Sequence, residues 1–201
     1  MSFLENNNIY TDLALEERER FKENVEIEGV KINKKYDENM HMTTTVVDIF
    51  NEKGAGEMGK PEGCYVTMET KLLKDNDEDF RKKIAEELTD NLVTIMEKQR
   101  PESVLIVGLG NLYATPDALG PKTVEKIESG KGVYCVSPGV LSQTGMETFS
   151  IIKGIINEVN PDLVIAIDSL AARNVRRITT TIQITDTGIT PGSGCLLYTS
   201  P

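Results

Sequence analysis

The most regular hydrophobic pattern of the chain lies between residues 77 and 99. The apolar side chains there recur mostly at spacings of three and four residues: Phe80, Ile84, Leu88, Leu92, Val93 and Met96. This spacing places them on one face of a helix. Asp77 or Asp79 can cap the first turn. The pattern therefore predicts an amphipathic helix over residues 77–99.

After Pro101, short aliphatic runs alternate with segments of helix length. The runs cover residues 103–111, 132–138 and 162–168, and the expected helices cover residues 117–127 and 146–159. Strands that are apolar on both faces are typical of a parallel sheet covered by helices. We predict an α/β fold with a doubly wound, mostly parallel sheet.

The segment from Thr43 to Thr70 has a different pattern. Two runs rich in β-branched residues, 43–50 and 64–70, flank the glycine-rich stretch 51–63. Such a pattern predicts two antiparallel strands joined by a long loop. We therefore expect a β hairpin inserted near the N-terminus. Further along the chain, we expect a helix over residues 169–178 and β structure over residues 179–189.

The N-terminal segment 11–24 is highly charged. Asp12 is placed to cap a helix, and Glu16 and Arg20 have the i,i+4 spacing of an ion pair on a helix surface. We expect an exposed helical arm.

The charge of the chain excludes some classes of partner. With 32 acidic and 22 basic side chains, the formal net charge is −10, so the basic surface that nucleic-acid phosphates require is missing. No apolar run approaches the length of a membrane span, and the N-terminus lacks a signal-peptide pattern. We expect a cytoplasmic protein that binds neither nucleic acid nor membrane.

The cysteine and histidine residues give no sign of a metal site. Cys64, Cys135 and Cys195 share no metal-ligand spacing, and His41 is the single histidine. We expect free thiols that act as small apolar fillers, an exposed His41, and no metal or cofactor. A dinucleotide fingerprint is also absent, because Tyr113 stands where its third glycine is needed.

Two carboxylates follow predicted strands. Asp117 comes shortly after the run 103–111, and Asp168 closes the run 162–168. In open α/β sheets, ligands bind beyond the carboxyl ends of the strands. Two partly buried carboxyl groups there can have separated pKa values, so that one activates water and the other donates a proton. The alternative is that both aspartates are helix caps.

Long segments of the chain resemble the germination protease family of endospore-forming bacteria. They are 107–124 (VGLGNLYATPDALGPKTV), 161–194, 43–70 and the arm 10–21. The resemblance implies an endopeptidase that degrades small acid-soluble spore proteins during germination. It also implies a fold similar to that of hydrogenase-maturation endopeptidases.

The resemblance assigns an atypical aspartic-type mechanism. The two proposed catalytic residues of the family fall on Asp117 and Asp168, the same residues that the strand-end argument selects. The hydrogenase-maturation enzymes bind nickel through carboxylates and a histidine, whereas no histidine follows in the matching region here. We therefore expect no metal.

The resemblance also implies a zymogen that cuts itself. Thr11–Ala14 is similar to the cleavage sequences of the family, which places the cut between Asp12 and Leu13. Residues 1–12 would then be a propeptide and 13–194 a protease domain that is incomplete at its C-terminus. The resemblance further implies a tetramer and a location in the forespore and spore core.

The last residues, 195–201, read CLLYTSP, which resembles the translated end of a sequencing adaptor. We expect them to be a non-native tail. Two alternative functions stay open: a metal-dependent endopeptidase of the hydrogenase-maturation type, and a non-enzymatic α/β binding domain.

Overall fold

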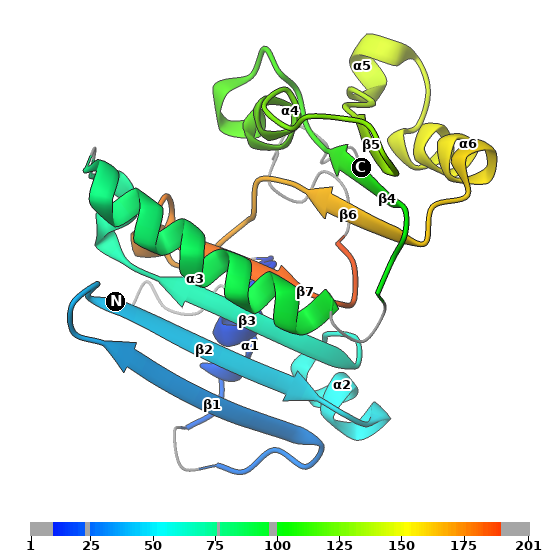
Figure 1. Ribbon diagram of the computed structural model, residues 1–201. Helices are drawn as coiled ribbons and strands as arrows, with labels where there is room; N and C mark the ends of the chain where they lie inside the picture. Colours follow the sequence, from blue (N-terminus) through cyan, green and yellow to red (C-terminus); the bar gives the residue numbers. More distant parts are fainter. Residues whose placement is uncertain (1–9, 23–24, 76, 97–99, 190–201) are drawn as a thin grey trace, which may run out of the picture. The chain divides into compact units, whose positions relative to one another are not determined.

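The computed structural model describes residues 10–22, 25–75, 77–96 and 100–189. The chain divides into two compact units. The first comprises Met1–Lys98 and Ala172–Thr187, and the second comprises Gln99–Ala171 and Gly188–Pro201. Each unit contains one of the two sheets (Figure 1). The expected tail, residues 195–201, lies outside the described residues.

The first unit contains a four-stranded antiparallel sheet in the order β1-β2-β3-β7. Its strands are β1 (Val30–Asp37), β2 (Met42–Ile49), β3 (Gly63–Glu69) and β7 (Thr181–Thr185). The predicted hairpin is confirmed as β2 and β3, and the predicted β structure after residue 179 is confirmed as β7. Because β1 and β7 extend the hairpin on either side, it is the centre of a separate sheet and not an insertion into a parallel one.

The sequence did not predict β1. Most of its side chains are exposed, and its sequence, VKINKKYD, contains three lysines. Charged residues are common on edge strands because they prevent pairing with other chains. The same charges hide the alternating pattern by which a half-buried strand is recognised.

One face of this sheet packs against α3 (Glu78–Met96), which runs along the strands in Figure 1. Ile84 of this helix packs with Met42 of β2 and Met68 of β3. The predicted helix is confirmed, and its first turn is capped by Asp77, whose Oδ1 accepts hydrogen bonds from the N–H groups of Asp79 and Phe80.

The opposite face packs against two short helices, α1 (Ala14–Arg18) and α2 (Glu52–Met58). Ala14 and Met58 contact the apolar side chains of this face, which are Val47, Ile49 and Tyr65. Because the side chains of a strand alternate between the two faces, the odd-numbered residues of β2 and β3 point towards α1. This face holds the N-terminal arm.

Helix α2 lies in the glycine-rich stretch that we expected to be a loop. Asn51 caps it by accepting a hydrogen bond from the Gly54 N–H at 2.8 Å. Gly54 is required at its position, because a Cβ atom there would lie 2.6 Å from the carbonyl oxygen of Gly29. Gly54 therefore lies in a helix, at the point where the helix closely approaches the backbone of Gly29.

The second unit contains a three-stranded parallel sheet in the order β5-β4-β6. Its strands are β4 (Val104–Gly108), β5 (Val133–Val136) and β6 (Leu163–Ile167). The α/β prediction is therefore confirmed, but the prediction of a mostly parallel sheet is wrong. The parallel pattern holds for these three strands, and the remaining described strands form the antiparallel sheet.

Helices lie on both faces of β4. Leu105 and Val107 pack with Ile152 and Ile156 of α6 (Thr148–Val159). Gly108, on the other face, contacts α4 (Leu119–Val124), where a Cβ atom would lie 2.4 Å from the carbonyl oxygen of Gly120. This placement is typical of a doubly wound unit.

Two expected helices differ in the structure. Residues 117–127 form a 3-10 turn, η2 (Thr115–Asp117), followed by the short α4. Residues 169–178 form only the 3-10 turn η3 (Val175–Arg177). The other short elements are η1 (Lys71–Lys74) and α5 (Leu141–Thr144).

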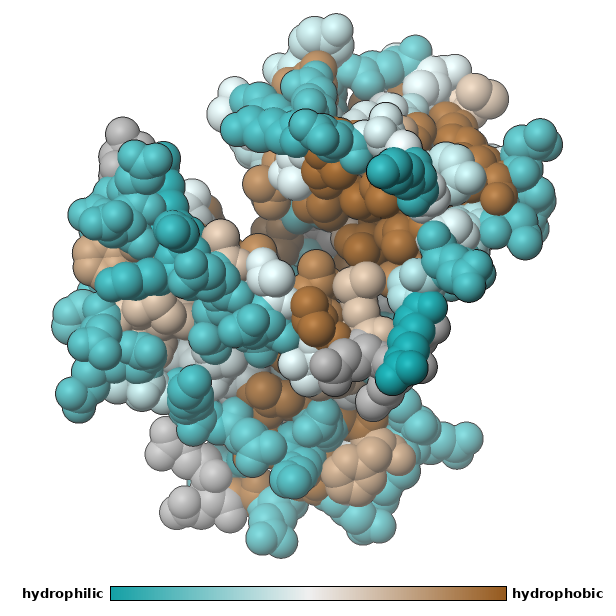
Figure 2. Space-filling view, viewed as in Figure 1, coloured by the Kyte–Doolittle hydropathy of each residue, from teal (hydrophilic) through white to brown (hydrophobic). Residues whose placement is uncertain are grey.

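The surface combines charged and hydrophobic regions. Figure 2 shows hydrophobic residues gathered around the parallel sheet, on the face turned to the viewer. Tyr134 of β5 and Val164 of β6 are among the exposed apolar side chains of this unit. Among the described residues, no helix has the length and hydrophobicity that crossing a bilayer requires.

The contact between β4 and α4 gives a testable prediction. A Cβ atom at Gly120 would lie 2.3 Å from the Ile167 carbonyl oxygen and 2.4 Å from that of Leu109. We expect Gly120→Ala to lower the free energy of unfolding by about 1–3 kcal/mol, because the strand ends must move apart. Urea denaturation measures this change.

Gly154→Ala is the matched control, because Gly154 lies inside α6 and a Cβ atom there meets nothing within 4 Å. Alanine is the better helix former, so this variant should gain about 0.5–1 kcal/mol. Equal effects of the two substitutions would contradict the packing argument.

Candidate functional site

The carboxyl ends of β4 and β6 lie next to each other. Beyond the last paired residues, the Leu109 N–H donates a hydrogen bond to the carbonyl oxygen of Ile167 at 2.8 Å. The pairing therefore continues to the residue directly before Asp168. The chain after Leu109 leads to Asp117, so the structure brings both predicted aspartates to the same edge of the same sheet.

Asp117 is buried, with 4% of its surface exposed. The Asn111 N–H donates to its Oδ2 at 2.9 Å and to its carbonyl oxygen at 3.0 Å. Gly110 makes this close turn possible: its φ is +112°, and a Cβ atom there would lie 2.1 Å from the Asp117 carbonyl oxygen. The loop after β4 is thus folded back onto the carboxyl group.

Burial raises the pKa of Asp117 above its ordinary value, and the hydrogen bond from the Asn111 N–H opposes this effect only in part. A carboxyl group with a raised pKa holds its proton at a higher pH than an exposed one. Asp117 is therefore suited to donate a proton in a reaction.

Asp168 is half-buried and its Oδ1 accepts a hydrogen bond from the Ser169 N–H at 2.7 Å. The segment that follows begins with irregular backbone, and α4 has Ala118 as its N-cap, without a side-chain cap. Neither aspartate therefore caps an α-helix in the described residues. The alternative prediction, that both aspartates are helix caps, is wrong.

Two amide side chains that sequence reasoning missed surround this loop. Asn111 Oδ1 accepts hydrogen bonds from the Tyr113 N–H at 3.0 Å and from Gln143 Nε2 at 2.8 Å. Gln143 belongs to α5, so this short helix supports the loop that holds Asp117. The sequence signal for Asn111 was its position at the end of the predicted strand run 103–111.

The described residues contain no group of three or more histidine, cysteine or carboxylate residues arranged to hold a metal ion. Cys64 and Cys135 form no disulfide within the described residues, as predicted, and Cys195 lies outside the described part. His41 is exposed, also as predicted, and lies 3.2 Å from the Tyr36 hydroxyl. A hollow of about 570 Å³ lies beside β5, but neither aspartate lines it.

The predicted cleavage site belongs to the first unit, where Gln183 of β7 holds it. Gln183 Oε1 accepts a hydrogen bond from the Ala14 N–H at 2.9 Å, and its Nε2 donates to the Asp12 carbonyl oxygen at 3.0 Å. Leu13 between them is extended and, like Ala14, 0% exposed. The peptide bond after Asp12 is therefore clamped from both sides.

Lys60 provides a further contact to this segment. Its Nζ donates a hydrogen bond to the Thr11 carbonyl oxygen at 2.8 Å. Burial lowers the pKa of Lys60, while the charges of Asp12 and Glu17 partly offset that effect. Although burial removes Lys60 from water, its hydrogen bond to the Thr11 carbonyl oxygen helps to hold the arm in place.

Glu16 is the most buried acidic side chain of the arm, with 3% of its surface exposed. Its carboxylate accepts hydrogen bonds from the N–H groups of Arg173 at 2.6 Å and Asn174 at 2.9 Å. Burial alone would raise the pKa of Glu16, but these bonds, with those from Thr11 and Arg177, lower it overall. Glu16 also explains the missing helix, because it binds two N–H groups of the segment that was expected to be helical.

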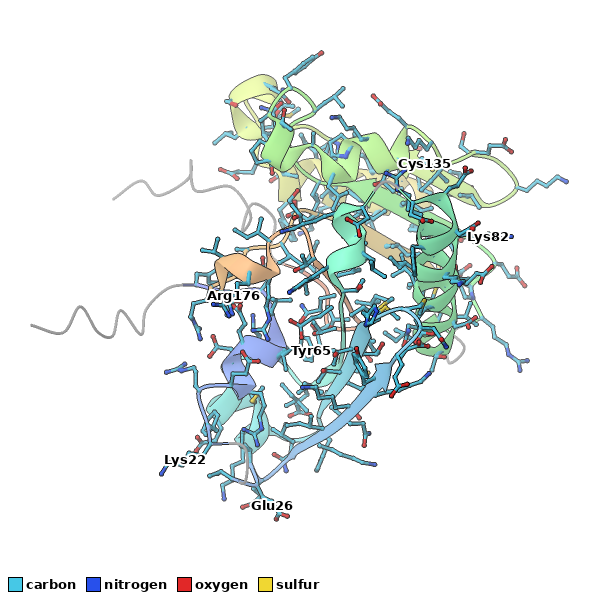
Figure 3. The ribbon with its side chains drawn as sticks, turned by 90° about the vertical axis from the view of Figure 1, so that its left-hand side faces the viewer. Lys22, Glu26, Tyr65, Lys82, Cys135 and Arg176 are labelled. Atoms are coloured by element: carbon cyan, nitrogen blue, oxygen red, sulfur yellow. The ribbon has the colours of Figure 1, made fainter. Side chains whose placement is uncertain are left out.

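Arg177 joins the arm to the sheet. Its guanidinium pairs with Glu16 at 3.3 Å, with Glu19 at 2.6 Å and with Glu69 of β3 at 2.7 Å. Arg176, its neighbour in η3, is exposed (Figure 3). Of the two arginines, only Arg177 has a carboxylate partner within the described residues.

The predicted cap of the arm helix is wrong. Leu13, and not Asp12, is the N-cap of α1. The Asp12 carboxylate instead accepts a hydrogen bond from the Tyr10 hydroxyl at 2.8 Å. Arg20 pairs with Glu17 at 2.9 Å in place of the expected Glu16, because Glu16 is turned into the protein.

Comparison with known proteins identifies close relatives. A family described as germination protease matches residues 5–196. The germination protease of Caldanaerobacter subterraneus subsp. tengcongensis is 44% identical over 92% of this chain and 61% of its own. Those of Clostridium perfringens and Clostridium acetobutylicum are 41% and 40% identical, over 93% and 94% of this chain and 62% and 63% of their own. The chain thus spans about three fifths of these relatives' length.

The raised pKa of Asp117 predicts a change in stability with pH. A carboxyl group whose pKa is raised by folding stabilises the protein below its ordinary pKa, about 3.9, and loses this contribution as the pH rises through the raised value. Asp117→Asn removes the charge and keeps an oxygen for the Asn111 N–H. We expect the variant to be more stable than the parent at pH 7 and equal to it near pH 3.

Urea denaturation at both pH values measures this difference. Asp162→Asn is the control of opposite sign, because hydrogen bonds from Ser103 lower the pKa of that exposed carboxylate. It should reduce stability at pH 7. If Asp117→Asn instead lowers the free energy of unfolding at pH 7, burial does not raise the pKa of this carboxyl group.

Proposed function

Because the chain belongs to the germination protease family, we propose that its parent protein is a self-activating endopeptidase that initiates the degradation of small acid-soluble spore proteins during germination. The observation that carries the catalytic part is the position of Asp117 and Asp168 at neighbouring strand ends, with Asp117 buried. Two carboxyl groups in different environments can divide acid and base roles.

In the proposed atypical aspartic-type reaction, Asp168 accepts a proton from a water molecule as the water oxygen attacks the peptide carbonyl carbon. Asp117 holds a proton and gives it to the departing amine nitrogen. The burial of Asp117 supports this division of roles, because it favours the protonated form. The loop bonds from Asn111 keep the acid in place.

Self-activation is the second part of the proposal. The cut between Asp12 and Leu13 would remove the propeptide 1–12. Both residues after the cut are buried, and Gln183 and Lys60 hold the backbone on either side. We infer that the arm must loosen before any active site can reach this bond, so docking of the arm delays activation.

The remaining parts of the proposal rest on the resemblance. They are a homo-tetramer, a location in the forespore and spore core, and a fold similar to that of the hydrogenase-maturation endopeptidases. Light scattering on the full-length protein tests the tetramer.

The catalytic proposal predicts the effect of two isosteric substitutions in the full-length protein. Asp168→Asn and Asp117→Asn should each reduce cleavage of a small acid-soluble spore protein at least about 100-fold, the scale of one acid or base group. Mass spectrometry of the products measures this loss, and circular dichroism checks the fold. Asp162→Asn, an exposed carboxylate of the same unit, is the activity control.

If only one of the two aspartates is needed, the paired mechanism is wrong although the protein is a protease. Loss of activity with EDTA that nickel or zinc restores would instead assign a metal-dependent endopeptidase. Lack of cleavage by the unmodified protein would contradict the proposed function itself.

The docked arm predicts how self-cleavage depends on pH. The lowered pKa of Glu16 means that its bonds stabilise docking at and above its ordinary pKa, and that this contribution is lost as the pH falls through the lowered value. We expect the processed chain to begin at Leu13, and self-cleavage to become faster as the pH falls, most strongly below the ordinary glutamate pKa of 4.5.

N-terminal sequencing after incubation at pH 4, 5 and 7 measures the site and the rate. Arg177→Met should accelerate processing at pH 7, because it removes the cation that binds Glu16, whereas Arg176→Met should not. A different first residue would remove the assignment of Asp12 and Leu13. Faster processing at high pH would contradict the role of Glu16.

A further inference from the structure

The Thr11 side chain connects two groups that lie after it in the chain. Its Oγ1 accepts a hydrogen bond from the Leu13 N–H at 3.1 Å. The same side chain hydrogen bonds the carboxylate of Glu16. The Leu13 nitrogen and the Glu16 carboxylate are therefore linked through a single hydroxyl group.

The geometry of α1 brings these two groups close together. Leu13 is the N-cap of the helix, and Glu16 is its third helical residue, with the Glu16 N–H donating to the Leu13 carbonyl oxygen at 3.1 Å. In helices, a glutamate at this position can reach back to the backbone nitrogen of the N-cap residue. Glu16 can thus contact the Leu13 nitrogen while α1 keeps its conformation.

Cleavage would change both ends of this link, and the inference rests on the processing proposed above. Water supplies a hydroxyl group to the Asp12 carbonyl carbon and a hydrogen to the Leu13 nitrogen as the bond between them breaks. The new α-amine then takes a proton from solvent, because its ordinary pKa is about 7.7–8. The Thr11 hydroxyl leaves with the propeptide.

We propose that the buried Glu16 carboxylate is the binding site for the α-ammonium group that cleavage creates at Leu13. The ammonium takes over the position of the Thr11 hydroxyl and binds Glu16 directly. Leu13 is 0% exposed in the uncut chain, and a charge created there needs a partner if the residue is to stay buried.

The cations around Glu16 are already paired with other groups, so Glu16 can bind this additional cation. Arg177 shares its charge among Glu16, Glu19 and Glu69, and Arg173 pairs with Glu17 at 2.6 Å. Lys60 points at the Thr11 carbonyl oxygen, which cleavage removes. Among these groups, Glu16 is the carboxylate that already shares a hydrogen-bond partner with the Leu13 nitrogen.

The new ion pair would connect the processed N-terminus to the segment after Asp168. The other bonds of Glu16 go to the N–H groups of Arg173 and Asn174, which follow Asp168 closely in the chain. The processed N-terminus would therefore be fixed to this segment, and α1 would stay docked after the twelve residues before the cut are lost.

The test makes Leu13 the first residue without using the activity of the protein. In the full-length chain, residues before Leu13 are replaced by the recognition sequence of a specific protease that leaves no added residue, and Asp168→Asn prevents self-cleavage. The α-amine of Leu13, labelled with ¹⁵N, is titrated by NMR. We expect its pKa to lie about one unit above the ordinary value of about 7.7.

The sign follows from the pairing, which stabilises the ammonium form. Its contribution to stability is present below the ordinary pKa and is lost as the pH rises through the raised one. Leaving one extra glycine before Leu13 moves the ammonium away from Glu16. This chain should show an ordinary α-amine pKa and a lower melting temperature at pH 7, by about 3–6 °C.

Glu16→Gln should also return the α-amine pKa to its ordinary value, whereas Glu17→Gln, in the same turn of α1, should not. An ordinary pKa in the chain that begins at Leu13 would overturn the proposal. So would a raised pKa that the added glycine leaves unchanged, a comparison that does not depend on folding of Glu16→Gln. Absence of self-cleavage in the unmodified protein concerns only the proposed function, because an added protease creates this N-terminus.

Discussion

The buried carboxylate of Glu16 is the interaction on which the first unit depends most. A carboxylate can be removed from water only if several donors replace its hydration. Here two backbone N–H groups, the Thr11 hydroxyl and Arg177 provide them. These donors come from segments far apart in the sequence, so Glu16 connects the N-terminal arm to the segment before β7.

The second unit depends on close contacts between backbone segments, whereas the first unit depends on a buried charge. Gly108 and Gly120 allow α4 to pack directly on the ends of β4 and β6, and Gly110 lets the loop turn back onto Asp117. The burial that raises the pKa of Asp117 is a result of this packing. The candidate acid is therefore made by the glycines of the loop as much as by the aspartate itself.

The sequence predicted those elements whose pattern is local. Helix α3, the strands of the parallel sheet, β2, β3 and β7 all carry a clear periodicity, and the strand-end argument placed Asp117 and Asp168 at the same sheet edge. The predictions that were wrong depend on contacts between distant residues. The expected helix over 169–178 gives its N–H groups to Glu16, and the antiparallel sheet is completed by β7, more than a hundred residues after β3. No local pattern carries such information, and the same holds for Gln183 and Lys60.

The lysines of β1 have a consequence for the behaviour of the protein at high concentration. An edge strand with unpaired backbone groups is a template on which another chain can add a strand, yet β1 carries three lysines and is exposed over most of its length. Adding a second copy at this edge would bring the lysines of the two β1 strands close together, which is unfavourable. The charges of β1 thus oppose the growth of the sheet from one copy of the protein to the next at this edge.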